Sequence, residues 1–593
     1  GLAQTRKLLT NFSKNSFYLL PEPLRRGEFL MNYCKVKPFI YFIRQINENK
    51  VIHAISLAYL CSVNYEKRSM NMKKYYWGIG AALLCIFWGT GCTRPVQETP
   101  ASGFASVRNE ILVDSLGREL VLNGINHVTK SPEDRYVYPN DEQLFKEFRN
   151  WGINCIRYGI NWDGLEPEPG QYNESYLQEI DRRVRWAEEN GIYLILDMHQ
   201  DLFGRKFGNG APEWATLDES LPHATGEVWS DSYLISPAVQ KSFDNFWANS
   251  PAKDGTGIQD HYINVWGMLA ERYADCKSVI GFDVMNEPFM GTQAQAVFQQ
   301  FMEGYIQYLH KHGQTQVSPE AMTAVWDNED QRAELMNQLT DKEAFTEILH
   351  AASETVSRFE QNELSRFYQK LRDRIRQADK NHLLFLEHNY FCNMGIKSSF
   401  HIPADTNGKP DSLCVYAAHA YDWVVDTDAA VNPGYERLDF IFSQLTASAR
   451  ERHLPALVGE WGAFYLGKSY LQSARHQIGL IEKYKLGHTY WCWWKDIETQ
   501  DYFSSVISRP YPQIVNGQLL SYSSTDGLTC QWKEDKTSPA PTLIFLPDLK
   551  AVSPEQIRIT PESSWELIPL EKGSKAGFLS ITPTGTVRSL QLK

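Results

Sequence analysis

The sequence predicts an α/β protein, a (β/α)8 TIM barrel followed by a small C-terminal antiparallel β-sandwich. Three observations support this prediction. Eight short apolar runs recur between residues 120 and 494, and longer amphipathic segments of helical character separate them. Strands that alternate with helices in this way pair in parallel. After about residue 506 the chain changes to short alternating runs punctuated by Pro and Gly, which is typical of an antiparallel sheet.

The eight apolar runs have the length and composition of buried strands. They are LVLNGIN (120–126), INCIRYGI (153–160), IYLILDMH (192–199), SVIGFDVMNEP (278–288), NHLLFLEH (381–388), LCVYAAHAY (413–421), PALVGEW (455–461) and GHTYWCWW (487–494). Eight strand–helix units over roughly 380 residues fit a closed barrel with long insertions. A doubly wound open sheet is the alternative fold, but the Gly-rich turn that follows its first strand is missing here.

The remaining segments set the domain boundaries. We assign residues 108–505 to the barrel and residues 506–593 to the β-sandwich, in which TLIFLP (542–547) and GFLSIT (577–582) are examples of the alternating runs. Residues 289–380, between the fourth and fifth predicted strands, are rich in Gln, Glu and Ala and are predicted to be helical. This insertion is either a wall over the site or a solvated appendage.

The first 107 residues differ from the rest of the chain and predict an export signal. Residues 1–69 carry 11 Lys+Arg and 4 Asp+Glu, a net charge of +7, in a chain whose total is −12. We interpret them as an upstream or non-native segment and exclude them from the fold. Residues 70–91 combine a basic start, an uncharged apolar run and small residues, which is the pattern of a secretory signal peptide. The apolar run is shorter than the ~20 residues that a membrane-spanning helix needs.

The end of the predicted signal peptide indicates a lipid anchor. Gly89-Thr90-Gly91-Cys92 resembles a loose bacterial lipoprotein box, in which Cys92 is lipidated and becomes the new N-terminus. The polar, Pro-rich stretch 92–107 then serves as a tether. The alternatives are a signal cleaved nearby without lipid and an uncleaved anchor. We therefore expect an exported protein that is attached to the membrane through its N-terminal lipid, at the cell surface or outer membrane, or is otherwise secreted.

Composition and motif content exclude several classes of function. The formal net charge of −12 and the lack of a long basic block predict no nucleic-acid partner. The six cysteines from Cys155 onward are widely spaced, and several lie in apolar runs, so we expect buried free thiols rather than a disulfide framework. The residues His199 and Asp201 are too sparse for a ligand set, and we expect neither a metal nor another cofactor. The G-x-S-x-G turn of lipases and esterases is absent.

Polar side chains cluster at the carboxyl ends of the predicted strands, where a barrel enzyme has its active site. Charges on buried strands are costly unless they are paired or used. Glu287 and Glu460 stand out, because they end the fourth and seventh runs and can face one another across the barrel mouth. Paired carboxylates are what glycoside hydrolysis requires: one protonates the leaving oxygen, and the other attacks or activates water.

The ordered set of strand-end residues resembles a known family. Asn286-Glu287-Pro288 after an apolar strand, with Glu460 on a later one, is similar to the retaining (β/α)8 glycosidases of clan A. Within that clan the chain looks like glycoside hydrolase family 5, the cellulase family, over about residues 110–505. The resemblance implies a retaining glycosidase that needs no cofactor.

Three segments look most like the endoglycosylceramidases of that family. They are LDMHQDLFGRKFGNGAPEW (196–214), GFDVMNEPF (281–289) and the junction Arg509-Pro-Tyr-Pro512. This resemblance implies a glycolipid substrate, in which the β-linkage between an oligosaccharide and ceramide is cleaved and both parts are released intact.

The family resemblance also implies a role for each site residue. Glu287 would be the acid/base and Glu460 the nucleophile. Asn286 would hydrogen-bond the 2-OH of the sugar, a bond that strengthens in the oxocarbenium-like transition state. Arg157 would lie near Glu460 and hold it ionised, since a neighbouring cation lowers the pKa of a carboxylate. Tyr421 would donate to Glu460 from the sixth strand.

Further substrate-binding candidates are less specific in the sequence; they are His199, His419, Asp201, Lys130 and Trp491. The two histidines would bind hydroxyls or tune the acid, and for each the alternative is a satisfied core imidazole. For Lys130 the alternative is a solvated loop. Trp491 and Trp493 alternate and are therefore expected to share one face of the strand. Trp491 is the predicted stacking platform for a sugar ring, while Trp493 fits core packing equally well.

Three functions remain open at this point. The leading one is a retaining endo-acting β-glycosidase that hydrolyses glycosphingolipids. The first alternative is the same chemistry on a polysaccharide such as β-glucan or mannan, because loops decide substrate choice. The second alternative is a non-catalytic glycan-binding lipoprotein. Five apolar side chains near the strand ends either line a ceramide channel or pack within loops; they are Phe203, Phe207, Trp214, Phe289 and Met290.

Overall fold

The computed structural model describes residues 103–593, except for 140, 227, 327, 329–330, 332–334, 336–340, 427, 432 and 465–468. The predicted upstream segment 1–69, the signal peptide 70–91, lipidation at Cys92 and most of the tether lie outside the described residues. Within the part of the chain that the structure describes, no helix is both long and apolar enough to cross a bilayer.

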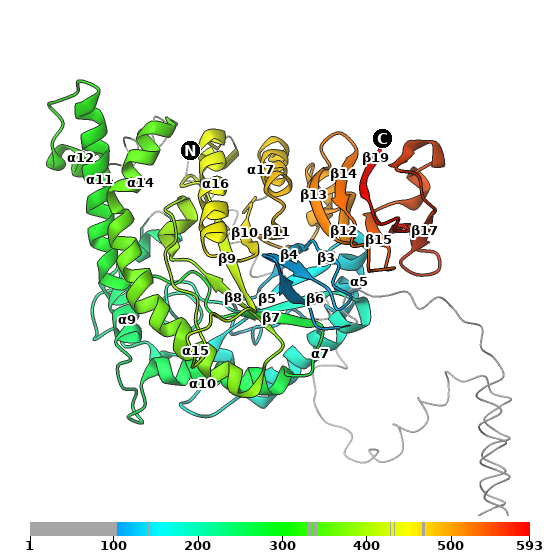
Figure 1. Cartoon of the computed structure of the whole chain (residues 1–593). Helices are drawn as coiled ribbons and strands as arrows, with labels where there is room; N and C mark the ends of the chain where they lie inside the picture. The colour runs from blue at the N-terminus through cyan, green and yellow to red at the C-terminus, as the bar shows by residue number, and fades with distance from the viewer. Residues whose placement is uncertain are drawn as a thin grey trace, which may run out of the picture. The chain divides into compact units, whose positions relative to one another are not determined.

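Eight strands close into a barrel whose neighbours are consecutive along the chain, so the predicted fold class is confirmed (Figure 1). The strands are β4 (Asn123–His127), β5 (Cys155–Ile160), β6 (Tyr193–Met198), β7 (Val279–Asp283), β8 (Leu383–Glu387), β9 (Cys414–Ala420), β10 (Ala456–Trp461) and β11 (Gly487–Tyr490). All eight pairings are parallel, including β11 with β4, which closes the ring. The residues that follow the strands therefore meet at one mouth of the barrel.

Amphipathic helices follow the strands along the chain. The longer ones are α5 (Glu142–Trp151), α7 (Glu174–Asn190), α10 (Ile258–Tyr273), α15 (Ser365–Ala378), α16 (Tyr435–Glu451) and α17 (Leu471–Tyr484), and the shorter ones are α6 (Trp162–Leu165), α8 (Ser232–Ile235) and α9 (Pro237–Trp247). Helix α7 shows how the sequence sets their limits. Asn173 caps its first turn by accepting from the backbone of Tyr176, and Gly191 ends it with a φ of 63°. Its apolar stripe, which includes Leu177, Ile180 and Val184, is buried.

The insertion at 289–380 is helical, as predicted. It contains α11 (Ala294–Lys311), α12 (Pro319–Trp326) and α14 (Lys342–Phe359) ahead of α15. Helices α11 and α14 pack side by side (Figure 1). Gly304 allows this close approach, because a Cβ there would lie 2.9 Å from the side chain of Ala351.

Two antiparallel sheets form the second part of the fold. One has the order β1 (Ser106–Arg108), β2 (Ile111–Val113), β3 (Glu119–Leu120), β12 (Tyr511–Val515), β15 (Thr542–Leu546), β18 (Gly577–Ile581) and β17 (Trp565–Pro569). The other has the order β13 (Gln518–Ser523), β14 (Leu528–Lys533), β19 (Val587–Leu592) and β16 (Ile557–Thr560). Alternation is clear in β14, where Leu528, Cys530 and Trp532 are buried and their neighbours are exposed.

The first three strands, β1 to β3, lie outside the barrel, although the barrel was predicted to begin at residue 108. They pair with the C-terminal sheet through β3 and β12, with Leu120 opposite Ile514, and not with the barrel. Strands of two or three residues carry too little pattern to be assigned to a sheet from sequence. The pairing of this segment with the C-terminal sheet was therefore not predicted.

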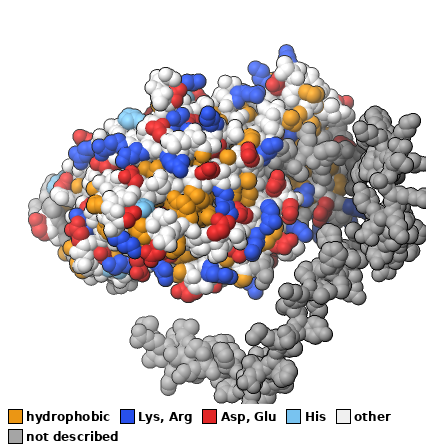
Figure 2. Space-filling view, turned by 90° about the horizontal axis from the view of Figure 1, so that it is seen from below, with side chains coloured by type: hydrophobic (Ala, Val, Ile, Leu, Met, Phe, Trp, Pro, Cys, Tyr) orange, Lys and Arg blue, Asp and Glu red, His pale blue; other side chains and the backbone are white. Residues whose placement is uncertain are grey.

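The described surface carries charges of both signs, and the described cysteines are free thiols. Figure 2 shows acidic and basic side chains interspersed on the face in view, with hydrophobic side chains between them. All six cysteines of the described residues are free, and four of them are buried, which confirms the expectation of free thiols.

Candidate active site

A pocket of about 250 Å³ opens among the residues that follow the barrel strands. It is lined by Lys130, His199, Asp201, Val228, Trp229, Ser230, Asp231, Asn286, Glu287, Tyr390, Asn393, Met394, Tyr421, Asp422, Trp423, Val425, Asp426, Glu460, Ala463 and Trp491. Eight of the ten residues predicted for the site are in this lining. The two exceptions, Arg157 and His419, lie beneath it.

Glu287 and Glu460 approach one another at the base of this pocket. A carboxylate oxygen of one lies within 4.8 Å of a carboxylate oxygen of the other. The two residues are only 7% and 5% exposed, and both still reach the pocket. Retaining glycosidases hold such carboxyl groups ~5–5.5 Å apart, whereas inverting enzymes leave ~6.5–9.5 Å for a water molecule. The separation here is that of direct attack by one carboxylate.

Glu460, at the end of β10, is held through both of its oxygens. Arg157 donates from Nη1 to Oε1 at 2.8 Å, and the hydroxyl of Tyr421 donates to Oε2 at 3.1 Å, which confirms both predicted contacts. Burial raises the pKa of Glu460, and the charges of His419 and Arg157 pull it back toward the ionised form. The effect of the cations is therefore to oppose burial, not to depress the pKa below its ordinary value.

Glu287 is fixed by an unusual backbone conformation. Its φ is +45°, in the left-handed region that costs of order 1–3 kcal/mol for a residue other than Gly. Its backbone N–H donates to Oε2 of Glu387 at 2.7 Å. The amide of Gln200 donates to the carbonyls of Asn286 and Glu287 at 2.9 and 3.2 Å. These bonds hold the strained turn, and neither Gln200 nor its role was predicted from the sequence.

Arg157 forms the floor of the site. Its side chain is fully buried and contacts four carboxylates at 2.8–2.9 Å, those of Asp197, Asp283, Glu387 and Glu460. Burial disfavours the guanidinium charge, but the carboxylates outweigh it and raise the pKa of Arg157 well above its usual range. Arg157 thus organises the acids from outside the pocket lining, and its assignment as a substrate-binding residue stays a prediction.

His419 lies at the same depth and links the acids. Nδ1 is 2.9 Å from Oε1 of Glu287 and 3.7 Å from Oε2 of Glu460, and Nε2 is 3.2 Å from Oε1 of Glu387. Burial opposes the charged ring, but these carboxylates raise the pKa of His419 well above its usual value. These carboxylates therefore favour the charged form of His419. His419 lies outside the pocket lining but contacts the acid/base candidate, so its expected role of binding a hydroxyl or tuning the acid stays a prediction.

The polar wall of the pocket contains the remaining predicted residues. The ring of His199 stacks on Trp491 with centroids 5.3 Å apart and planes 12° apart. Nδ1 of His199 bonds Asp197 at 2.8 Å, while Nε2 is buried without a partner among the described residues. Burial lowers the pKa of His199 to about 3, so the ring is neutral and Nε2 is available to a substrate hydroxyl.

Lys130 lies in a loop of the same wall, and its side chain lines the pocket while remaining 37% exposed. Nζ is 2.5 Å from Oδ2 of Asp201 and 4.7 Å from the centroid of the Trp491 ring. Asn209 donates to the same carboxylate oxygen at 2.6 Å. The ion pair can hydrogen-bond the hydroxyls of a sugar, and the neighbouring indole face can stack on its pyranose ring.

Two alternatives left open for apolar side chains are decided in favour of packing. Strand β11 ends at Tyr490, so strand alternation does not extend to Trp493, which packs against His127 and Tyr138 instead of facing the pocket. The five proposed channel residues do not line the pocket. Phe203, Phe289 and Met290 are buried in the barrel core, and Phe207 and Trp214 pack against it.

Two groups of side chains bring possible metal ligands within 4.8 Å of one another: Glu287, His419 and Glu460, and Asp197, Asp283 and Glu387. In the second group the Arg157 guanidinium already supplies the positive charge. In the first group His419 does the same. Both sets are therefore explained by the cations of the chain itself.

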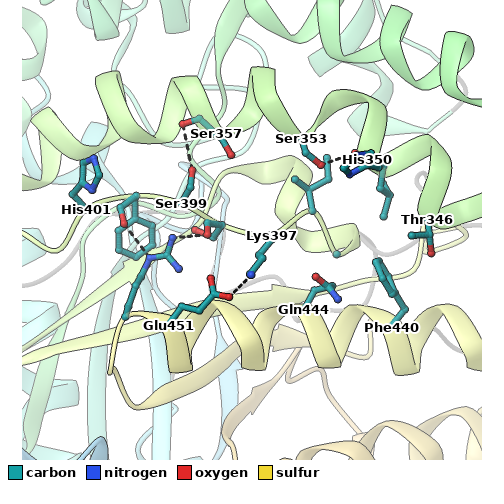
Figure 3. A pocket seen from close by; sticks show the side chains of 16 residues that line it. Thr346, His350, Ser353, Ser357, Lys397, Ser399, His401, Phe440, Gln444 and Glu451 are labelled. Carbon is teal, nitrogen blue, oxygen red and sulfur yellow. Dashed lines mark hydrogen bonds and ion pairs between the residues drawn. The ribbon is translucent and has the colours of Figure 1, made fainter.

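A larger cavity of about 710 Å³ lies between α14 and α16 (Figure 3). Its lining includes Ser399, whose hydroxyl donates to the carbonyl of Ser357, and Lys397, which is paired with Glu451. Arg452, also in the lining, donates to three backbone carbonyls. Several polar groups of this larger cavity are engaged within the chain, and its lining contains a single carboxylate, Glu451, so the smaller pocket with the two carboxylates is the catalytic candidate.

The fold and this carboxylate pair define a glycoside hydrolase with retaining geometry. A family profile described as "Cellulase (glycosyl hydrolase family 5)" matches residues 113–497, and one described as "Glycoside hydrolase family 5 C-terminal domain" matches residues 509–587. The chain therefore belongs to glycoside hydrolase family 5, as its strand-end residues predicted.

The chain is similar to several proteins named endoglycoceramidase. It is 35% identical over 228 residues to one from Cyanea nozakii, covering 33% of this chain and 44% of that protein. It is 24% identical over 462 residues to endoglycoceramidase I of Rhodococcus hoagii, covering 74% and 78% of the two chains. The structure of endo-glycoceramidase II from Rhodococcus sp. with ganglioside GM3 matches with a TM-score of 0.63 at 23% identity, covering 82% of this chain and 100% of that one. This last match supports the fold.

Proposed function

We propose that the chain is a retaining, endo-acting β-glycosidase that cleaves the bond between the oligosaccharide and the ceramide of glycosphingolipids. One observation carries the chemistry: Glu287 and Glu460 place carboxylate oxygens within 4.8 Å of one another in a single pocket. Their partners differ, because Glu460 is held by Arg157 and Tyr421 and Glu287 by His419 and Asn393. The presence of both acids argues against a non-catalytic glycan-binding protein.

The geometry assigns each carboxylate a role in a double displacement. Glu460 attacks the anomeric carbon while Glu287 gives its proton to the leaving oxygen, which releases the aglycone and forms a glycosyl ester on Glu460. Glu287, now a carboxylate, removes a proton from water, whose oxygen attacks the same carbon and frees Glu460. Two inversions give net retention of the β configuration. Asn286, which lines the pocket beside Glu287, contacts the sugar 2-OH in this arrangement.

The lining of the pocket supports an amphiphilic substrate. One set of lining residues, His199, Lys130 with Asp201, and Trp491, offers hydrogen-bonding groups and an indole face. A second set has apolar or aromatic side chains and comprises Val228, Trp229, Met394, Trp423 and Val425. The two sets adjoin, because Nζ of Lys130 lies 5.9 Å from the centroid of the Trp229 ring. A glycan fits the first set and a lipid chain the second. The names of the relatives, endoglycoceramidases, support the same substrate class.

The decisive experiment incubates the enzyme with ganglioside GM3 beside a soluble β-glucan, and identifies the products by mass spectrometry. We expect intact oligosaccharide and ceramide from GM3, no free monosaccharide, and no shortening of the glucan. NMR of the first product should show the β-anomer. Glu460→Gln serves as the inactive control. Stepwise release of monosaccharide contradicts endo action, and an α-anomer contradicts retention.

A polysaccharide substrate is the second candidate, because the matching family profile is described as a cellulase. The same incubation separates the two candidates. Shortened β-glucan chains with intact GM3 establish an endo-β-glycanase and overturn the ceramide assignment, while the roles of the two carboxylates stand.

For the N-terminus we propose export followed by lipidation at Cys92. The support is the order of a basic start, an apolar run and small residues before that cysteine. Expression of the full chain in a bacterium fed an alkyne-labelled palmitate should label the protein, and Cys92→Ser should lose the label. A labelled Cys92→Ser variant, or an unlabelled wild type with an intact signal segment, contradicts this proposal.

A further inference from the structure

The acid/base carboxylate is contacted asymmetrically. Oε1 of Glu287 accepts from Nδ2 of Asn393 at 2.6 Å and faces Nδ1 of His419 at 2.9 Å. Oε2 accepts no hydrogen bond from the described residues. Asn393 is 5% exposed and lines the same pocket. One oxygen of the acid is thus occupied by two N–H donors and the other is left for the substrate.

The amide of Asn393 is itself oriented from behind. Its Oδ1 lies 2.9 Å from Nε2 of His388, whose Nδ1 lies 2.7 Å from the hydroxyl of Tyr416. With the ring proton on Nε2, His388 donates to the amide oxygen and Nδ1 accepts from Tyr416; with the proton on Nδ1, that atom donates to the hydroxyl of Tyr416. Burial lowers the pKa of His388 to about 3, so the ring carries one proton. The backbone N–H of His419 also donates to Nε2, at 3.2 Å.

These contacts form one chain of hydrogen bonds. Tyr416 contacts His388, His388 contacts Asn393, and Asn393 donates to Glu287. Every member is at most 7% exposed. The reversed amide would set an oxygen against the Glu287 carboxylate, so the ionised acid favours the orientation in which Nδ2 faces it.

We propose that Asn393 is a positioning residue for the acid/base: it keeps Oε1 of Glu287 as an acceptor, so that the proton delivered to the leaving oxygen is carried by Oε2. In the first step that proton passes from Oε2 to the glycosidic oxygen, and in the second Oε2 takes one from water. The inference rests on the proposed retaining chemistry and adds a residue to it.

The test compares Asn393→Ala and Asn393→Asp with the wild type on two substrates. With phenyl β-lactoside, whose leaving group needs a proton, kcat/KM of Asn393→Ala should fall about 10- to 100-fold. With dinitrophenyl β-lactoside, whose leaving group needs little protonation, the fall should be less than about 3-fold. A purely structural defect lowers both by the same factor.

The pH profile of kcat/KM gives a second readout. Its alkaline limb reports loss of the proton from the acid, and a donor bonded to the carboxylate favours that loss. Asn393→Ala should therefore move the alkaline limb to higher pH. Asn393→Asp should move it further, because a second carboxylate opposes ionisation of the first.

Further variants keep the test independent of folding defects at residue 393. Tyr416→Phe removes the far end of the chain and should move the alkaline limb in the same direction by a smaller amount. The matched controls are Tyr511→Phe, which deletes a hydroxyl that is also buried but bonds Gly152, and Asn190→Ala, which deletes a buried amide in α7. Both controls should leave the limb in place.

The outcomes separate this inference from the proposed function. An alkaline limb that stays in place in Asn393→Ala, Asn393→Asp and Tyr416→Phe, or equal losses on the two lactosides, overturns the role of Asn393. If Glu287→Gln retains full activity on phenyl β-lactoside, the acid/base assignment itself fails and the inference falls with it. Loss in Glu287→Gln without selective loss in Asn393→Ala refutes this inference alone.

Discussion

Two groups of carboxylates occupy the mouth of the barrel, and only one of them opens onto the pocket. The upper pair, Glu287 and Glu460, is 5–7% exposed and lines the cavity. The lower trio, Asp197, Asp283 and Glu387, is fully buried and lies outside the lining. Both groups bring oxygens within 4.8 Å of one another and share the same two cations. Depth, rather than residue type, separates a reactive acid from a supporting one.

The difference in depth has an electrostatic consequence. Burial raises the pKa of Asp197 to about 7 and that of Asp283 to about 6, while Arg157 opposes both shifts. Part of the lower trio therefore keeps its protons at mildly acidic pH, which limits the negative charge beneath the upper pair. The trio fixes and neutralises Arg157, and Arg157 in turn holds Glu460. The following variants test whether the two groups are separable.

The largest expected effect is at the nucleophile. Glu460→Gln should lower kcat by on the order of 10⁴-fold or more, because an amide does not form the glycosyl ester. Its melting temperature should stay near that of the wild type, since Gln keeps the shape and one acceptor for Arg157 or Tyr421. Substantial residual turnover on GM3 or β-glucan removes Glu460 from the role.

Arg157→Met should instead act on the whole fold. It leaves four buried carboxylates without their guanidinium, and breaking a buried ion pair on one side costs about 3–5 kcal/mol. Urea denaturation should show this loss at pH 7.5, and a smaller loss at pH 5, where protons neutralise part of the trio. Equal losses at the two pH values contradict the idea that the trio is charged mainly above pH 6.

Glu287→Gln should show a loss that depends on the leaving group. On a substrate with a poor leaving group, kcat/KM should fall about 10²- to 10³-fold, because the general acid is missing. Azide should restore turnover of dinitrophenyl β-lactoside and yield a β-glycosyl azide, since a small anion replaces the water that Glu287 no longer activates. A rate that azide leaves unchanged, with no azide product, argues against the acid/base role.

The barrel and the upper pair were predictable because strand period and strand ends carry a strong pattern. Asn286-Glu287-Pro288 and Glu460 each follow an apolar run, and the rule that parallel strands share one active edge brings them together. The same rule does not predict how deep in the barrel each side chain lies. It brought Arg157 and His419 to the acids correctly, but it did not show that both lie outside the pocket lining.

The supporting residues were missed for a different reason. Gln200 lies in the loop after β6 and Asn393 in the short 3-10 helix Tyr390–Met394 after β8, where no periodicity marks them. Their function depends on the strained turn at Glu287 and on contacts across about 90 to 110 positions of sequence. The pairing of β3 with β12 crosses a still larger separation. Such contacts follow from how the loops fold back, which a single sequence does not specify.

The raised pKa of Asp197 in the lower trio should make the free energy of unfolding depend on pH. The folded state keeps the proton of Asp197 up to about pH 7, while the unfolded chain releases it near pH 4. Unfolding therefore releases a proton between these values, and stability falls as pH rises through this window. Asp197→Asn cannot ionise, so relative to wild type it should gain roughly 1–3 kcal/mol between pH 4.5 and 7.5. A constant difference across that range contradicts the shift.

The smallest expected effect is at Tyr421, which contacts Glu460 of the upper pair. Tyr421 donates to Oε2 of Glu460, while Arg157 holds Oε1. Tyr421→Phe leaves the ion pair and removes one hydrogen bond, so kcat should fall roughly 10-fold. The acidic limb of kcat/KM, which reports ionisation of the nucleophile, should move to higher pH, because a donor that stabilised the carboxylate is gone. The alkaline limb should not move. If Tyr421→Phe shifts the alkaline limb instead, the ionisation of Glu460 and that of Glu287 are not separately controlled. The distinction drawn between the two carboxylates then fails.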